Sequence, residues 1–285
     1  MKDEALAVRG LCKAYPGFRL ENVSLAVPRG TIVGLIGENG AGKSTLIGAA
    51  LGLIKRDAGE VRVLGGDRLD ETVLEQVGVV FDGNNFPDML TAEKLNRVFR
   101  RIWRAWDERG YFELLKRLGV PANKRVRELS KGTRTKLTIA VALSHHPRLL
   151  VLDEPTSGLD PVVRDDILDL FLDFVQDEQN AVLVSSHITS DLEKVADHIV
   201  FLHEGRVVFE KPKDELRYRY GVLRCGSAQF ERLDPQDCVA CRRQDYEWEV
   251  LLSDRAGAQK KYPGAVIDPA SIDEIMLLYI KGEAR

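Results

Sequence analysis

Residues 37–45 read Gly-Glu-Asn-Gly-Ala-Gly-Lys-Ser-Thr, and this stretch decides the fold. The mostly apolar residues before it, 31–36, predict a buried strand, and those after it, 46–51, predict a helix. A glycine-rich loop between a strand and a helix can turn its backbone N–H groups inward, and the new helix adds its unsatisfied N-terminal amides. The sequence therefore predicts a loop that binds the phosphates of a nucleoside triphosphate.

Two side chains of this loop complete the prediction. Lys43 is placed to reach the β- and γ-phosphates, and the Ser44 hydroxyl is placed to bind Mg²⁺. A glycine-rich structural turn is the alternative, and the flanking strand and helix argue against it. The loop residues expected to contact the nucleotide are Gly37, Asn39, Gly40, Ala41, Gly42, Lys43, Ser44 and Thr45.

A second apolar run, residues 149–152, predicts another buried strand, which ends in two acids. The first acid, Asp153, can hold Mg²⁺ through water, and the second, Glu154, can polarise the water that attacks the γ-phosphate. Many α/β proteins carry an acid at a strand end by chance, so this pair needs support from elsewhere in the chain.

Residues 129–133 read Leu-Ser-Lys-Gly-Thr and come directly before a helical run, residues 134–143. Ser130 is a good N-cap, and Gly132 leaves the backbone amides of the first turn uncovered. This helix start is therefore also built to face an anion, although an ordinary capped helix would look the same.

Together these features resemble the ATPase subunits of ABC transporters, in particular prokaryotic exporter ATPases that work with a separate permease chain. The glycine loop, the Leu-Ser-x-Gly signature, the acidic strand, residues 157–160 (Ser-Gly-Leu-Asp) and His187 occur in the family's order, within about residues 4–215. The resemblance implies an α/β fold, the P-loop NTPase ABC cassette, with a parallel core sheet, an antiparallel β-subdomain and an inserted helical subdomain. It also implies that the chain uses ATP and Mg²⁺.

In that family, ATP lies between the glycine loop of one subunit and the signature of a second. The resemblance therefore implies a dimer, either of this chain or with a close paralogue, that encloses two ATP molecules. Ser130 and Gly132 would contact the γ-phosphate bound by the partner's Lys43, and Asp160 would link the two sites across the dimer.

The resemblance also implies roles for three further residues. Glu154 would be the catalytic base, and His187 would sense the γ-phosphate. Tyr15 stands where the family stacks an aromatic ring on adenine. A histidine after an apolar strand is otherwise most often a structural residue, so the role of His187 depends on its place in the family's order.

One position departs from the family's pattern, because Asp82 takes the place of a glutamine after residues 77–81. A carboxylate is a good ligand for Mg²⁺, so we expect metal binding to survive, with Asn84 able to share the role. The Lys131 and Thr133 variations in the signature are milder, because Ser130 and backbone amides supply the anion contacts. The machinery is otherwise complete, and the site is interpreted as competent for hydrolysis.

Length and composition agree with this interpretation. A chain of 285 residues with 44% hydrophobic content can bury one large core and carry a small appendage. No apolar run reaches the roughly 18 residues of a membrane span, and no signal peptide is seen. We expect a cytoplasmic protein that lies peripherally on the inner face of the membrane through its permease. Four cysteines fit a reducing compartment.

Residues 91–148 hold 15 Lys or Arg against 5 Asp or Glu, a net charge of +10 in a chain whose net charge is −3. The segment indicates a core stripe with a solvated basic face, or a basic face against anionic lipid headgroups. Its apolar side chains repeat at helical spacing at Leu95, Val98, Phe99, Ile102, Trp103 and Trp106.

The same basic segment supports a second class of function, a soluble ABC-type ATPase that acts on nucleic acid or ribosomes. Such proteins typically resemble two fused cassettes or carry a long inserted coiled coil. This chain holds one cassette and an insert without sustained heptads, so nucleic acid is not the expected partner.

The organisation predicted along the chain is an ABC ATPase domain at residues 1–215, with its helical subdomain at about 88–147, and a small C-terminal α+β domain at 216–285. Cys238 and Cys241 have the spacing of half a zinc site, but plain reduced thiols are the favoured interpretation because no second pair completes it. His145 and His146 are expected to interact with a helix end rather than with a metal.

Overall fold

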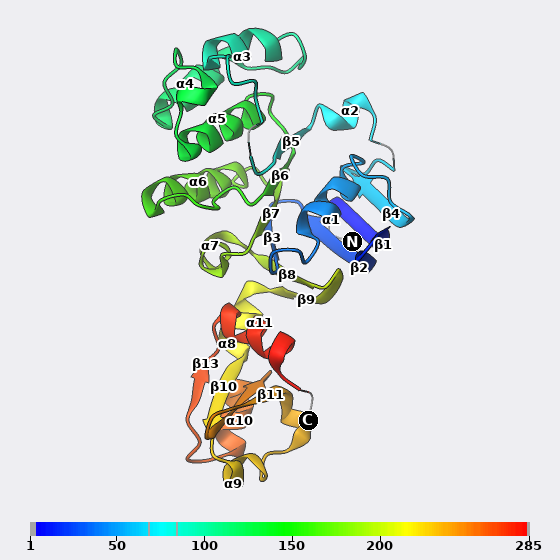
Figure 1. Ribbon diagram of the computed structural model, residues 1–285, viewed down its shortest axis with the longest axis vertical. Coiled ribbons are helices and arrows are strands. Elements are labelled where there is room, and N and C mark those ends of the chain that lie inside the picture. The colour runs from blue at the N-terminus through cyan, green and yellow to red at the C-terminus, as the bar shows by residue number, and fades with distance from the viewer. Residues whose placement is uncertain (1–3, 68, 84, 284–285) are drawn as a thin grey trace.

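The computed structural model describes residues 4–67, 69–83 and 85–283, whose strands form three sheets (Figure 1). The largest has six strands, all parallel except the last, which returns antiparallel. The strands at residues 32–36, 149–153 and 181–186 are buried along their whole length, as expected for a parallel sheet covered on both faces. In spatial order the strands are β5 (Val77–Val80), β6 (Leu149–Asp153), β7 (Ala181–Ser186), β3 (Ile32–Ile36), β8 (His198–His203) and β9 (Arg206–Pro212).

The second sheet is the antiparallel β-subdomain that the resemblance implies. Its order is β2-β1-β4, with β1 at Glu4–Tyr15, β2 at Phe18–Pro28 and β4 at Ala58–Val63. The apolar faces of these strands share one core with α1 (Lys43–Ala50) and with one face of the large sheet. This core fixes the glycine loop between the two sheets. Residues 204–205 form the turn between β8 and β9, and both have positive φ, as a two-residue hairpin requires.

The helical segment follows β5 and precedes β6 in the sequence, and it lies at the top of Figure 1. The apolar stripe predicted there does not form one helix, because α3 (Ala92–Phe99) ends at Phe99 and a new helix begins after Asp107. The Asp107 carboxylate accepts a hydrogen bond from the backbone of Gly110 at 2.8 Å and so caps α4 (Glu108–Arg117). Val98 and Ile102 are exposed, whereas the rest of the stripe packs inward.

Aromatic rings hold this segment together and attach it to the core. Phe99 and Trp103 stack with their centroids 4.9 Å apart, and Trp103 stacks in turn on His145 at 4.3 Å with an interplanar angle of 4°. His145 lies just past the end of α5 (Lys131–Leu143) and is buried. Burial is the main cause that lowers the pKa of its imidazole, so the ring is neutral at pH 7. A neutral ring gains little from a helix dipole, and the expected role does not fit His145.

The third sheet belongs to the C-terminal part, at the bottom of Figure 1, and its order is β11-β12-β10-β13. A capping box stands at Ser271, since Ser271 and Glu274 each accept a hydrogen bond from the other's backbone N–H. It opens α11 (Ile272–Lys281), which packs between this sheet and α7 (Thr189–Val195). The strands are β10 (Gly221–Cys225), β11 (Cys238–Gln244), β12 (Glu247–Leu252) and β13 (Ile267–Pro269).

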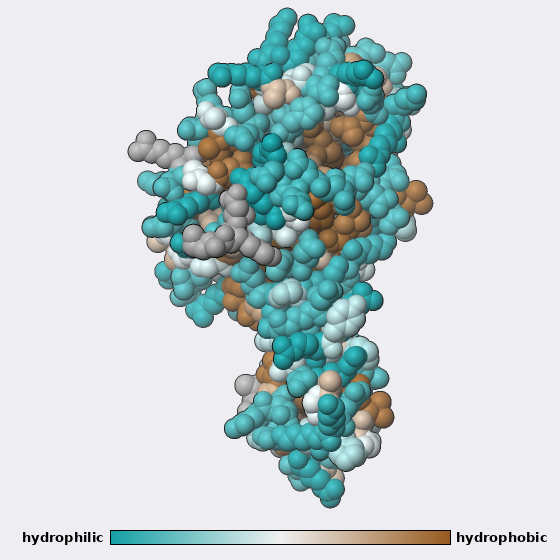
Figure 2. Space-filling model, turned by 180° about the vertical axis from the view of Figure 1, so that it is seen from behind, coloured by the Kyte–Doolittle hydropathy of each residue, from teal (hydrophilic) through white to brown (hydrophobic). Residues whose placement is uncertain are grey.

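The remaining helices connect these layers. The surface is mainly hydrophilic, with hydrophobic patches that are most extensive on the larger, upper part in the view of Figure 2. Cys225 and Cys241 are buried in the core of the third sheet, and Cys238 is half-buried.

The other helices are α2 (Glu71–Leu74), η1 (Val126–Glu128), α6 (Pro161–Phe174), α8 (Lys213–Arg219), α9 (Ser227–Phe230), η2 (Pro235–Asp237) and α10 (Arg255–Lys261).

The stack of His145 on Trp103 generates a prediction about stability and pH. Below about pH 6.5 the unfolded chain protonates this histidine while the folded protein keeps it neutral. The unfolded state then binds more protons, so the free energy of unfolding decreases as the pH is lowered. His145→Phe keeps a ring against Trp103 and removes the titrating group. Its Tm should therefore fall less between pH 7.5 and pH 5.5 than that of the wild-type protein. Parallel curves for the wild type and His145→Phe would contradict the assignment of His145 as the titrating group.

Candidate active site

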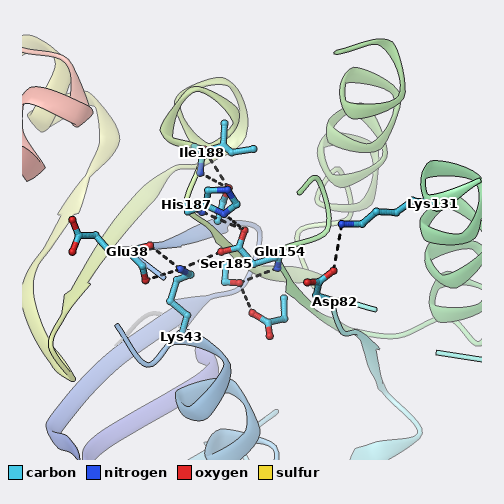
Figure 3. A network of polar contacts seen from close by, with 11 residues as sticks. Glu38, Lys43, Asp82, Lys131, Glu154, Ser185, His187 and Ile188 are labelled. Carbon is cyan, nitrogen blue, oxygen red and sulfur yellow. Dashed lines mark hydrogen bonds and ion pairs between the residues drawn. The ribbon is translucent and has the colours of Figure 1, made fainter. Parts of the chain in front are cut away.

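The candidate site lies at the edge of the large sheet where the parallel strands β3, β7 and β6 all end. In the register of the sheet, Ile36 pairs with Ser186 and Asp153 pairs with Ser185, so the three strand ends lie level. The loop before α1, the Asp153-Glu154 pair and His187 therefore emerge side by side (Figure 3). This is the edge at which open α/β sheets bind ligands.

The glycine loop has the backbone that the sequence predicts. Gly40 and Gly42 have φ of +86° and +108°, in the left-handed region where a side chain is strained. A Cβ on Gly42 would also come within 2.5 Å of the Phe18 ring, and one on Gly37 would meet the backbone carbonyl oxygen of Leu202. Gly42 is the N-cap of α1 and offers no side-chain cap, so the first-turn amides are left for an anion.

Lys43 is the cation at the centre of the site. It is buried, and its ammonium group donates hydrogen bonds to the carbonyl oxygens of Gly37 at 2.7 Å and Glu38 at 3.2 Å. It also forms an ion pair with Glu154, whose Oε1 lies 3.1 Å away. The other oxygen of Glu154 lies 2.6 Å from Nδ1 of His187 (Figure 3). The structure thus brings the predicted phosphate-binding lysine, base and histidine into direct contact.

Glu154 has an unusual backbone. Its φ is +52°, a conformation that costs a residue other than glycine about 1–2 kcal/mol. The Glu154 N–H donates to Oγ of Ser185 at 3.0 Å, and that hydroxyl donates to Oδ1 of Asp153 at 2.6 Å. Ser185 therefore positions both acids. Sequence reasoning missed this residue, although a hydroxyl at the end of an otherwise apolar strand is a signal that could have identified it.

A cavity of about 620 Å³ opens in front of the loop. Three of its oxygen-bearing residues are Ser44, Asp82 and Asp153, the kind of hard donor set that Mg²⁺ prefers, and Lys43 with the loop amides suits a triphosphate. Ala41 and Gly37 support the loop from behind, because Ala41 is buried and Gly37 lies against Leu202. The lining residues are Gly17, Phe18, Glu38, Asn39, Gly40, Gly42, Lys43, Ser44, Thr45, Asp82, Asp153 and Glu154.

The aromatic residue nearest to the loop is not the predicted one. Tyr15 lies at the turn between β1 and β2, is 43% exposed, and has the ammonium group of Lys13 at 5.2 Å from its ring centroid. Within the described part of the chain, Gly17 and Phe18 line the cavity and Tyr15 does not. Stacking of Tyr15 on adenine remains a prediction, and Phe18 is a contact that sequence reasoning missed.

The signature residues lie at the start of α5, apart from this cavity. Ser130 accepts a hydrogen bond from the backbone of Thr133 at 3.2 Å and so caps the helix. Asp160 caps α6 in the same way, accepting from Val163 at 3.1 Å. Among the described residues that line the Lys43 cavity, Ser130, Gly132 and Asp160 are missing. One chain therefore holds the phosphate loop and the acids together, and it keeps Ser130 and Gly132 of the signature outside their cavity.

Asp82 lies at the edge of the cavity with an exposed side chain, and Lys131 is its nearest cation, at 3.8 Å. Asn84, which was expected to share its role, lies outside the described residues. Within residues 4–67, 69–83 and 85–283, no group of three or more His, Cys, Asp and Glu side chains is gathered so as to hold a metal ion. A metal at this edge would therefore need oxygen atoms of the nucleotide as well.

A lysine in a glycine loop, paired with a strand-end glutamate that contacts a histidine, defines a P-loop ATPase. A profile of the ABC transporter family matches residues 20–157. Relatives named as ATP-binding proteins of transporters agree with it, at 33–34% identity over 73–80% of this chain. The protein belongs to the ATP-binding subunits of ABC transporters, and it binds and hydrolyses ATP to drive transport.

Several relatives share about a third of their residues with this chain. The ABC transporter ATP-binding protein YtrB of Bacillus subtilis (strain 168) is 33% identical over 217 residues, which are 75% of this chain and 74% of the relative. The bacitracin transport ATP-binding protein BcrA of Bacillus licheniformis is 33% identical over 80% of this chain and 74% of the relative. The lantibiotic transport ATP-binding protein SrtF of Streptococcus pyogenes is 34% identical over 73% and 91%.

Solved structures show the same cassette. An ATP-binding subunit of an ABC transporter superposes with a TM-score of 0.65 at 31% identity, covering 75% of this chain and 92% of that one. The dimeric post-hydrolysis structure of the ATP-binding cassette MJ0796, bound to ADP and Pi, has a TM-score of 0.65 at 25% identity and covers 73% and 98%. The predicted fold class and the predicted ATPase activity are confirmed.

The contact between Glu154, Lys43 and His187 generates the first catalytic prediction. Glu154→Gln keeps the size of the side chain but removes the charge that accepts a proton from water, so ATP turnover should fall by at least ~100-fold. ATP binding should persist. Lys43→Ala should instead weaken ATP binding itself, by roughly 10- to 100-fold, because it removes charge-assisted hydrogen bonds to phosphate.

The measurements are phosphate release and equilibrium binding of ATP. Glu178→Gln is the matched control, because it makes the same chemical change on the exposed turn before β7, at the opposite edge of the sheet. Normal turnover in Glu154→Gln would rule out Glu154 as the base.

Proposed function

We propose that this chain is the ATPase subunit of an exporter, that it acts as a dimer, and that it powers a separate membrane permease. The observation that carries the proposal is the division of the site. Lys43, Glu154 and His187 lie together in one chain, while Ser130 and Gly132 start a helix outside their cavity. A second subunit can supply the missing half, as the dimeric arrangement of the MJ0796 cassette suggests.

The contacts of the free subunit suggest how hydrolysis proceeds. ATP phosphate oxygens take the place of the Glu154 carboxylate beside Lys43, so the lysine neutralises the β- and γ-phosphates. The released carboxylate accepts a proton from water, and the water oxygen bonds to the γ-phosphorus. The bond between the γ-phosphorus and the β,γ-bridging oxygen breaks, which gives ADP and phosphate. His187, already in contact with Glu154, orients the carboxylate and meets the γ-phosphate.

Mg²⁺ fits this site on the chemistry of its donors. Ser44, Asp82 and Asp153 would hold it, with Asp153 acting through water, and the ion would neutralise charge on the β- and γ-phosphate oxygens when bound. Asp160, at the start of α6, would link the two sites of the dimer, and Tyr15 would stack on adenine.

Export is favoured by the relatives, since BcrA is named for bacitracin transport and SrtF for lantibiotic transport. We propose that the protein lies at the inner membrane face through its permease. No helix within the described ranges is both long and apolar enough to cross a membrane. We also propose the division into residues 1–215, with the helical subdomain at about 88–147, and 216–285. The end of β9 at Pro212 supports it.

A mixing experiment tests the shared site. Ser130→Arg puts a large side chain where the partner's γ-phosphate would lie, and Lys43→Ala removes the phosphate-binding cation. Each protein alone should be inactive, whereas a mixed dimer contains one intact site and one doubly damaged site. Activity should reappear in the mixture and should rise more steeply than linearly with protein concentration. Strong hydrolysis by a dilute, demonstrably monomeric Ser130→Arg protein would refute the shared site.

A second experiment tests the link to transport. The tagged Glu154→Gln protein, expressed in its own host, should retain a polytopic membrane protein when it is purified from detergent-solubilised membranes. Identification of the retained chain by mass spectrometry provides the measurement. Recovery of ribosomal proteins or nucleic acid in its place would favour the alternative class, a soluble ABC-type ATPase.

A further inference from the structure

Two of the positions at which this chain varies from the family's pattern, Asp82 and Lys131, contact each other. Asp82 follows β5, and Lys131 is the first residue of α5, and the two lie 49 residues apart in the sequence. In the folded chain, Oδ1 of Asp82 lies 3.8 Å from the ammonium nitrogen of Lys131 (Figure 3). The contact joins the loop after β5 to the start of the signature helix.

The side chain of Lys131 also reaches a third element. A Cβ placed on Gly158 would come within 3.3 Å of the lysine nitrogen, so the absence of a side chain there leaves room for the lysine. A cation in the first turn of a helix is disfavoured by the helix dipole, so Lys131 does not serve the stability of α5. Its position is better explained by its contacts with Asp82 and with the space beside Gly158.

Asp82 lies between two hollows. On one side it lines the nucleotide cavity with Ser44 and Asp153. On the other it lines a cleft of about 210 Å³ together with Lys131 and Arg134. Both members of the ion pair are about half exposed, at 54% for Asp82 and 51% for Lys131. Because the carboxylate is not fixed by burial, it can turn from the lysine towards a ligand in the nucleotide cavity.

We propose that Lys131 is a positioning residue that competes with Mg²⁺ for Asp82. In the free subunit the ion pair holds the loop after β5 against the signature helix and turns the carboxylate away from the metal position. Binding of Mg²⁺ with nucleotide breaks the ion pair. Lys131 and the start of α5 are then no longer held against the loop after β5. The proposal rests on the proposed function, because it takes Asp82 to be a ligand of the Mg²⁺ that accompanies ATP.

The competition predicts a measurable effect on metal affinity. Removal of Lys131 should lower the Mg²⁺ concentration that gives half-maximal binding of nucleotide by about two- to five-fold, the size expected for an exposed ion pair. The readout is calorimetric binding of a non-hydrolysable ATP analogue at increasing Mg²⁺, at a protein concentration where gel filtration shows monomers. Hydrolysis plays no part in this measurement.

Two matched variants separate the ion pair from general electrostatics. Arg134→Ala removes a cation from the same cleft, one turn further along α5, and should shift the Mg²⁺ curve less than Lys131→Ala. Lys131→Arg retains the charge and should restore a curve close to the wild type. In an Asp82→Asn background, Lys131→Ala should cause no further shift, because the carboxylate for which the lysine competes is gone.

Three results would overturn the proposal: no shift in Lys131→Ala, an equal shift in Arg134→Ala, or a shift that persists in the Asp82→Asn background. The titration of the wild-type protein distinguishes failure of this proposal from failure of the proposed function. If the wild type binds the analogue with Mg²⁺ and the variants fail to differ, only the role of Lys131 is wrong. If the wild type binds no nucleotide, the proposed function itself fails.

Discussion

The parallel pairing of β7 with β3 on one side and β6 on the other is the constraint on which the site depends. The three strands end level, so the chain leaves the sheet at three adjacent points, and the residues that follow must share one space. One strand contributes the loop with Lys43, one contributes Glu154, and one contributes His187. Since the strands are buried throughout, a shift in their register would expose apolar side chains and misplace all three groups.

This constraint also explains how a buried lysine is tolerated. An unpaired charge at the position of Lys43 would cost several kcal/mol, and a strand-end carboxylate offsets that cost. The pairing leaves Glu154 occupied in the free subunit. The same carboxylate can therefore stabilise the empty site and, once phosphate replaces it, act on water.

Local signals carried most of the prediction. The strand before Gly37 and the acids after residue 152 each depend on residues that lie close together in the sequence. They were identified because backbone geometry dictates residue type there. The parallel sheet and the antiparallel subdomain followed from such segments and from the family resemblance.

Contacts between distant side chains could not be predicted in this way. The pairing of Asp82 with Lys131, the stacking of His145 on Trp103, and the hydrogen bonds of Ser185 each join elements whose spacing appears only in the folded chain. The stripe at residues 95–106 shows the same limit. Its residues repeat at helical spacing, but α3 ends at Phe99 and Asp107 caps a new helix.

The packing of α11 against α7 has a mechanical consequence. The side chain of Glu193 in α7 accepts a hydrogen bond from the backbone of Ile272 at 3.2 Å, and Ile275 and Leu192 are buried in one continuous core. Close-packed interiors transmit displacement, because a gap of even half an ångström forfeits contact energy. Because α7 begins two residues after His187, a shift of the backbone at that histidine would displace α7. The C-terminal sheet would then move with α7 through α11, or the contact between the two helices would repack.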